Sequence, residues 1–211
     1  DGDRVELVYT KDYTTAPGAG GAVGSPDTKN DEKETDDPEK TEQRVYSDVS
    51  ENDWFFSAVS FMTEKNFMNG VSENEFAPYA GTTRAMVWTV LARMSGIGTS
   101  GANTWYEKGR AWALENNISD GKNPDERITR EQLAAMLYRY AGFKGLDVSA
   151  TCDISSFDDA KSISAYADGA MRWAHAMKIV NGKSEKLLDP SGFATRAEIA
   201  AMLMRFTENC K

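Results

Sequence analysis

The chain contains few of the residues that build catalytic and metal sites. Among its 211 residues there is one histidine, His175, and there are two cysteines, Cys152 and Cys210. One histidine excludes a metal site built on several histidines, and the sequence contains neither a Cys-x-x-Cys pair, a phosphate-binding glycine loop nor a dinucleotide fingerprint. His175 lies off the aromatic stripe of its expected helix, so we interpret it as structural or solvent-facing. The sequence therefore predicts a protein without catalytic residues, metal or cofactor.

The chain also lacks a positive charge balance and a long apolar run. Its net charge is −9 and its pI about 4.8, which excludes the basic face that duplex nucleic acid requires. No apolar run approaches the roughly 20 residues that span a bilayer, and the polar N-terminus is unlike a signal peptide. Because the chain begins at Asp1 rather than at methionine, we expect it to be part of a longer protein, with any export signal upstream.

The first 44 residues differ in composition from the rest. Residues 1–16 begin with the alternation of a short strand, which is either the last strand of an upstream β domain or one that pairs with a neighbouring molecule. Residues 17–44 are first glycine-rich and then strongly acidic. Such a segment buries too little apolar surface to repay its ordering, so we expect a disordered linker.

Three segments of the remaining chain can be laid over one another: 45–98, 99–145 and 152–211. In each, an aromatic residue precedes a glycine by sixteen positions, a Thr-Arg pair follows, and a second arginine lies nine positions after the first. Shared spacing of this kind indicates one supersecondary unit used three times, and units this short share a core. Cys152 and Cys210 flank the third segment, so a disulfide that clamps it and two free thiols both remain open.

Each repeat reads as helix, turn, loop, helix, which makes the fold class all-α. The first helix is expected to start at the aromatic residue and to stop at the glycine. The second is expected to start at the threonine, where Thr129 with Gln132 and Thr195 with Glu198 fit a capping box. Met86 stands at that place in the first repeat, so half of its box is missing. Apolar residues at i, i+3, i+4 and i+7 predict one buried stripe on each second helix.

The arginine after each capping threonine is the most informative charged residue. Arg84, Arg130 and Arg196 fall at the first helical position, where the helix dipole disfavours a cation. One interpretation is an anion-binding corner, in which an anion meets both the guanidinium and the free N–H groups of the helix terminus. The alternative is an arginine paired with an acid of a neighbouring repeat, or simply solvated. The second arginines lie near helix C-termini, where a cation is favoured, and are interpreted as structural.

The aromatic residues that open the first helices are Trp54, Trp105 and Tyr166. Aromatic faces pack against the C–H faces of sugars and equally well in protein cores, so a single one favours neither role. Arginine and aromatic residues at matched places in three repeats favour an acidic carbohydrate as the ligand.

These residues make residues 45–208 resemble a tandem of three S-layer homology domains. The resemblance rests on the openings Tyr46-Ser47-Asp48-Val49 and Phe157-Asp158-Asp159-Ala160, on the Asn-Gly or Asp-Gly turns, and on Thr-Arg motifs such as Ile128-Thr129-Arg130-Glu131. It implies a pseudo-threefold bundle in which one helix of each repeat lines the centre and grooves lie between projecting prongs. It also implies non-covalent anchoring of a secreted protein, with its cargo domain upstream, at the bacterial cell surface. The implied partner is an acidic, pyruvylated polysaccharide linked to peptidoglycan, bound without membrane insertion.

Carried over by position, the resemblance assigns ligand-binding roles to aspartates, aromatics, arginines and glycines. They are Asp48, Trp54, Gly70, Arg84, Trp105, Gly121, Arg130, Asp159, Tyr166, Gly182 and Arg196. Repeat two lacks the opening aspartate, repeat one lacks the motif glutamate, and repeat three has Tyr166 where the others have tryptophan. We therefore expect one or two competent grooves rather than three. The alternative functions are a protein–protein module that holds a surface-layer partner in the same grooves, and an enzyme whose catalytic domain lies upstream.

Overall fold

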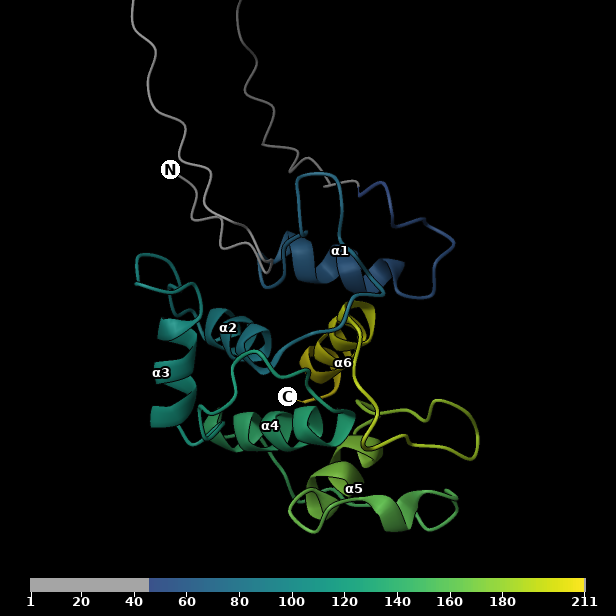
Figure 1. Ribbon diagram of the computed structural model, residues 1–211. Coiled ribbons are helices and arrows are strands. Elements are labelled where there is room, and N and C mark those ends of the chain that lie inside the picture. The colour runs from purple at the N-terminus through teal and green to yellow at the C-terminus, as the bar shows by residue number, and fades with distance from the viewer. Residues whose placement is uncertain (1–45, 211) are drawn as a thin grey trace, which may run out of the picture.

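The structure is a computed structural model, and it describes residues 46–210. The described chain folds into six α-helices and one 3₁₀ turn, Ala160–Ser162 (Figure 1). The α-helices are α1 (Phe56–Glu64), α2 (Arg84–Met94), α3 (Glu107–Glu115), α4 (Arg130–Phe143), α5 (Asp168–Ala176) and α6 (Arg196–Asn209). The prediction of an all-α fold is confirmed for this part, whereas the expected strand at 1–16 and linker at 17–44 lie outside the described residues. None of these helices has the length and apolar character needed to cross a membrane.

The longer helices of the three segments begin where the Thr-Arg pairs predict. α2, α4 and α6 start at the arginines, and the preceding threonine hydroxyl accepts a hydrogen bond from the third helical N–H in each. The first capping box differs from the prediction, because Met86 Sδ takes the missing acceptor's place at 3.5 Å from Thr83 N. A thioether is a weak acceptor, and the corresponding bonds from Gln132 and Glu198 are shorter, at 3.1 and 2.9 Å.

The shorter helices begin and end at other residues than predicted. α1, α3 and α5 start two residues after Trp54, Trp105 and Tyr166, so each aromatic precedes its helix. They also end well before the glycines, at positions where Asn66, Asn117 and Lys178 adopt left-handed φ values of 55, 56 and 57°. Asparagine tolerates this conformation well, and Lys178 shows that helix termination here does not depend on glycine.

The strongest helix–helix contacts connect neighbouring segments. α2 packs against α3, α4 against α5, and α6 returns to pack against α1, so the contacts close into a ring. Figure 1 shows α2, α4 and α6 gathered at the centre, with α1, α3 and α5 outside them. The predicted apolar stripes of the central helices are buried in one core, which contains Val87, Leu133 and Ile199 at zero exposure.

Three extended residues just before the central helices are joined by a closed cycle of backbone hydrogen bonds. Ile128 N donates to Thr82 O at 2.9 Å, Ala194 N to Ile128 O at 3.1 Å, and Thr82 N to Ala194 O at 3.3 Å. All three residues are buried. Because each segment both donates and accepts once, the N-terminal ends of α2, α4 and α6 are fixed relative to one another.

Candidate functional site

Arg196, at the start of α6, reaches into the loop that follows α1. Its Nε donates to Phe76 O and its Nη2 to Asn69 O, each at 2.7 Å, and its guanidinium lies 4.5 Å from the Phe76 ring centroid. The side chain is 1% exposed, and burial lowers its pKa to about 10. Arg196 therefore clamps the last segment of the chain to the first.

Arg130 makes the same contacts one segment along the chain. Its Nε donates to Leu188 O at 2.9 Å and its Nη2 to Asn181 O at 2.8 Å, in the loop after α5. Arg130 is 4% exposed, and burial lowers its pKa in spite of nearby carboxylates. These two arginines lie where the sequence places them, but the Nε and Nη2 groups of each donate to carbonyl groups of the fold.

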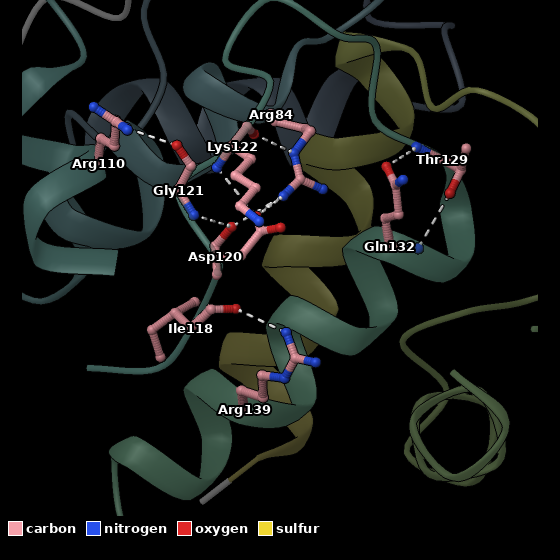
Figure 2. A network of polar contacts seen from close by, with 10 residues as sticks. Arg84, Arg110, Ile118, Asp120, Gly121, Lys122, Thr129, Gln132 and Arg139 are labelled. Carbon is pink, nitrogen blue, oxygen red and sulfur yellow. Dashed lines mark hydrogen bonds and ion pairs between the residues drawn. The ribbon is translucent and has the colours of Figure 1, made fainter. Parts of the chain in front are cut away.

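Arg84 makes a more open version of the clamp. Its Nε donates to Lys122 O at 2.9 Å, but its Nη2 contacts two side chains, Ser119 Oγ at 3.2 Å and Asp120 Oδ1 at 2.5 Å (Figure 2). The Asp120 side chain is 57% exposed. The Arg84 side chain is itself 11% exposed, but its guanidinium lies beside a largely solvated carboxylate.

The expectation that an anion would meet free N–H groups at these helix termini is wrong. The first N–H of each central helix already donates to a carbonyl of another segment, and so does the second. The six donors pair with Glu126 O, Pro124 O, Gly192 O, Pro190 O, Ala80 O and Pro78 O at 2.9 to 3.0 Å. The third N–H donates to the capping threonine, so only side chains remain to bind a ligand here.

The two opening aspartates hold the loops that the buried arginines contact. Asp48 accepts from Phe76 N at 2.8 Å and Ala77 N at 2.7 Å, and Asp159 accepts from Leu188 N at 3.0 Å and Asp189 N at 2.7 Å. In the middle segment, which lacks an opening aspartate, Asp120 accepts from Lys122 N at 3.1 Å. The loop is therefore held in all three segments by a carboxylate.

A cavity of about 300 Å³ lies beside Arg84, and the three segments all contribute to it. Its lining consists of Arg84, Ser119, Asp120, Gln132, Ala135, Met136, Arg139 and Tyr166. The four residues from α4 are spaced i, i+3, i+4 and i+7, so they share one helix face. Arg139 is exposed and donates a long hydrogen bond of 3.4 Å to Ile118 O, as Figure 2 shows. This volume is at the lower end of what small-molecule sites use.

Tyr166, which lines this cavity, is held by Glu131, the second residue of α4. Glu131 Oε1 accepts from Tyr166 Oη at 3.2 Å and from Ser164 Oγ at 2.7 Å, while Oε2 accepts from Ser164 N at 2.9 Å. Burial, followed by the charge and hydrogen bond of Glu131, raises the pKa of Tyr166 to about 12. The Tyr166 ring is fixed in place although it is 55% exposed.

The other residues named from the sequence lie apart from this lining. Trp54 is 62% exposed and packs edge-on against Phe55, and Trp105 packs in the same way against Tyr106. Gly121 has a left-handed φ of 64°. A Cβ on Gly70 would lie 2.5 Å from two carbonyl oxygens, and Gly182 is crowded in the same way by Ser184 and Leu187. Of the eleven residues named, the structure brings Arg84 and Tyr166 together in the cavity.

Sequence reasoning missed three residues of this region: Gln132, Arg139 and Glu131. Gln132 was assigned only a capping role, and Arg139 was interpreted as structural from its place near a helix C-terminus. Glu131 stands where the first and third motifs have alanine. The second motif therefore carries an unusual charge at Glu131, and the next repeat carries an unusual tyrosine, Tyr166. The two exceptions together indicate that these residues interact.

Comparison with known proteins finds one matching family model and several longer proteins that resemble the chain. The S-layer homology domain model matches residues 45–85 and 156–200. An endoglucanase of Bacillus sp. (strain KSM-635) is 28% identical over 75% of the chain and 18% of its own length. An amylopullulanase of Thermoanaerobacterium thermosulfurigenes is 29% identical over 78% of the chain and 10% of its length. A surface-layer 125 kDa protein of Lysinibacillus sphaericus is 24% identical over 72% of the chain and 14% of its own length.

The chain spans less than a fifth of the length of these relatives, so the activities of the named enzymes do not carry over to it. The matches agree with the predicted location outside the cell, at the bacterial surface. Residues 45–85 and 156–200 thus match the S-layer homology domain.

Proposed function

We propose that this chain anchors a secreted protein non-covalently to the bacterial cell envelope, by binding an acidic polysaccharide of the cell wall. The observation that carries the proposal is the cavity beside Arg84, where two guanidinium groups and an immobilised aromatic ring face one space. A guanidinium orients a carboxylate through paired, charge-assisted hydrogen bonds, and an aromatic face contributes apolar contact with a sugar. The cargo domain is proposed to lie elsewhere in the same polypeptide.

The proposal includes three repeats, 45–98, 99–145 and 152–211, related by a pseudo-threefold axis. The cyclic helix contacts, the ring of backbone hydrogen bonds and the repeated arginine clamps support it for the middle repeat as well. We propose one inter-repeat groove beside each arginine clamp. Among these, the Arg84 groove is proposed as the competent one, and the acidic group is proposed to be a pyruvate ketal on a sugar.

Co-sedimentation with purified wall polymer tests the proposal. Arg139→Gln removes a cation from the cavity with little effect on the fold, because the side chain is exposed and makes one long hydrogen bond. We expect it to weaken binding about tenfold. Arg205→Gln at the matching position of α6 is the control and retains most of the affinity. Equal affinity of Arg139→Gln and the wild type would contradict the proposal.

The alternative is a groove that holds a protein from the surface layer. Polymer stripped of protein by protease distinguishes the two, since a polysaccharide ligand survives that treatment and a protein partner does not.

A further inference from the structure

The face of α4 that lines the cavity has a near-identical counterpart on α6. Both faces carry alanine, methionine and arginine at the same spacing, and they differ at the third helical residue, which is Gln132 in α4 and Glu198 in α6. The two faces are Gln132, Ala135, Met136, Arg139 and Glu198, Ala201, Met202, Arg205. The chain therefore contains a natural comparison in which one amide replaces one carboxylate.

In α6 the carboxylate of Glu198 already interacts with the cations around it. Glu198 Oε2 accepts from Thr195 N at 2.9 Å, while Oε1 is bonded by Lys183 Nζ and lies 4.0 Å from Arg130 Nη1. Burial raises the pKa of Glu198, but the hydrogen bonds from Lys183 and Thr195 and the charges of Lys183 and Arg130 outweigh it, so the pKa lies below its ordinary value. Glu198 is ionised at neutral pH and acts as an internal anion beside Arg130.

In α4 the amide makes the same capping bond without the charge. Gln132 Oε1 accepts from Thr129 N at 3.1 Å, as Figure 2 shows, and its amide nitrogen is a donor rather than an acceptor. The charged groups in the lining are then Arg84, Arg139 and the largely solvated Asp120. Among the lining residues, two cations and one carboxylate leave one unbalanced positive charge. The buried carboxylate of Glu131 is not part of the lining and is engaged by Tyr166 and Ser164.

We infer that Gln132 is the specificity-determining residue of this cavity: its neutral amide keeps the site open to one carboxylate, whereas Glu198 fills the equivalent place on α6 with the protein's own carboxylate. This inference rests on the proposed function, because it names the residue that selects an acidic ligand at the same site. It also gives a physical reason why the places beside Arg84 and Arg130 differ although their helices are alike.

The test compares Gln132→Glu with Glu198→Gln in the full chain, using two probes. The first probe is purified wall polymer, and the second is sodium acetate, followed by NMR at the Nε–Hε groups of Arg84 and Arg139. Gln132→Glu is expected to keep the capping bond and the thermal midpoint, but it places an anion in the same lining as both arginines. We expect it to weaken polymer binding about tenfold or more and to abolish the acetate-induced shifts. Glu198→Gln, the matched control, binds polymer within about twofold of the wild type.

The outcomes separate this inference from the proposed function. Polymer binding by Gln132→Glu at wild-type affinity, or an equal loss in Glu198→Gln, would overturn the inference and leave the anchoring function standing. Acetate shifts in the wild type that vanish in Gln132→Glu, without polymer binding to either protein, would support the anion-selective cavity and overturn the anchoring function. The absence of both acetate shifts and polymer binding in the wild type would overturn both.

Discussion

Tyr166 and Glu131 come from different segments of the chain and meet through a hydrogen bond of 3.2 Å from the phenol to the carboxylate. Each is an exception in its own repeat, since Tyr166 replaces a tryptophan and Glu131 replaces an alanine. A phenol next to a protein surface needs an acceptor that holds its orientation, and Glu131 supplies it while it also fixes Ser164. The two substitutions together give the cavity an aromatic wall of defined position.

We predict that Glu131→Gln lowers the pKa of Tyr166 from about 12 toward the ordinary value of about 10. Burial remains in the variant, but the negative charge that opposes ionisation is removed. NMR of the Tyr166 ring carbon bonded to the hydroxyl, assigned with Tyr166→Phe, measures the titration. Because the folded pKa is raised, the stability that Tyr166 contributes is complete below pH 10 and is lost as the pH rises through 12. An unchanged Tyr166 titration in Glu131→Gln would refute this coupling.

Arg196→Lys is predicted to lower the free energy of unfolding by about 1–3 kcal/mol, because lysine cannot serve both Phe76 O and Asn69 O inside the core. Arg84→Lys serves as the comparison and costs less, since one of its partners, Asp120, is largely solvated. Urea denaturation measures both. Equal losses of unfolding free energy in the two variants would show that the burial of Arg196 adds nothing to the stabilisation by its hydrogen bonds.

Gly70→Ala is predicted to cost about 1–3 kcal/mol, because the new methyl group would lie 2.5 Å from the carbonyl oxygens of Glu75 and Ser72. Gly142→Ala, within α4, is the matched control. A Cβ there has no neighbour within 4 Å, so alanine stabilises the helix by about 0.5–1 kcal/mol. Thermal unfolding of the two variants gives shifts of opposite sign, and shifts of the same sign would be inconsistent with the loop geometry.

Asp120→Asn is predicted to reduce the dependence of stability on acid pH. Burial raises the pKa of Asp120, but the hydrogen bonds from Lys122 N and Arg84 and the charges of Arg84 and Lys122 together outweigh it and hold the pKa below its ordinary value. The stability that Asp120 contributes is therefore present above its pKa in the unfolded chain, and it is lost as the pH falls through its lower pKa in the folded protein. Urea midpoints measured from neutral to acid pH test this, and identical pH profiles for the variant and wild type would count against the ion pair.

Local signals in the sequence predicted the central helices well. A threonine hydroxyl that caps the helix at Arg84, Arg130 or Arg196 needs only residues next to it in the chain, so its effect can be read from spacing. The partners of those arginines cannot be read in this way. Phe76 O and Asn69 O are some 120 residues away from Arg196, and any residue presents the same carbonyl.

The candidate site was predictable only in part, because spacing identifies single residues but not their long-range contacts. The spacing of Arg84 and Tyr166 singled them out, but their meeting in one cavity depends on contacts between neighbouring segments. The sequence provides no such signal for Arg139, because a cation near a helix C-terminus needs no ligand to explain it. The expected anion contact with helix N–H groups failed because the carbonyls that fill those positions belong to other segments.

Calorimetric titration of the chain with purified wall polymer, before and after chemical removal of the acidic groups, tests the central claim most directly. The account predicts saturable binding at about one site per chain that persists after protease treatment and disappears with the acidic groups. Undiminished binding to the neutralised polymer would contradict an anion-selective cavity beside Arg84 and Arg139.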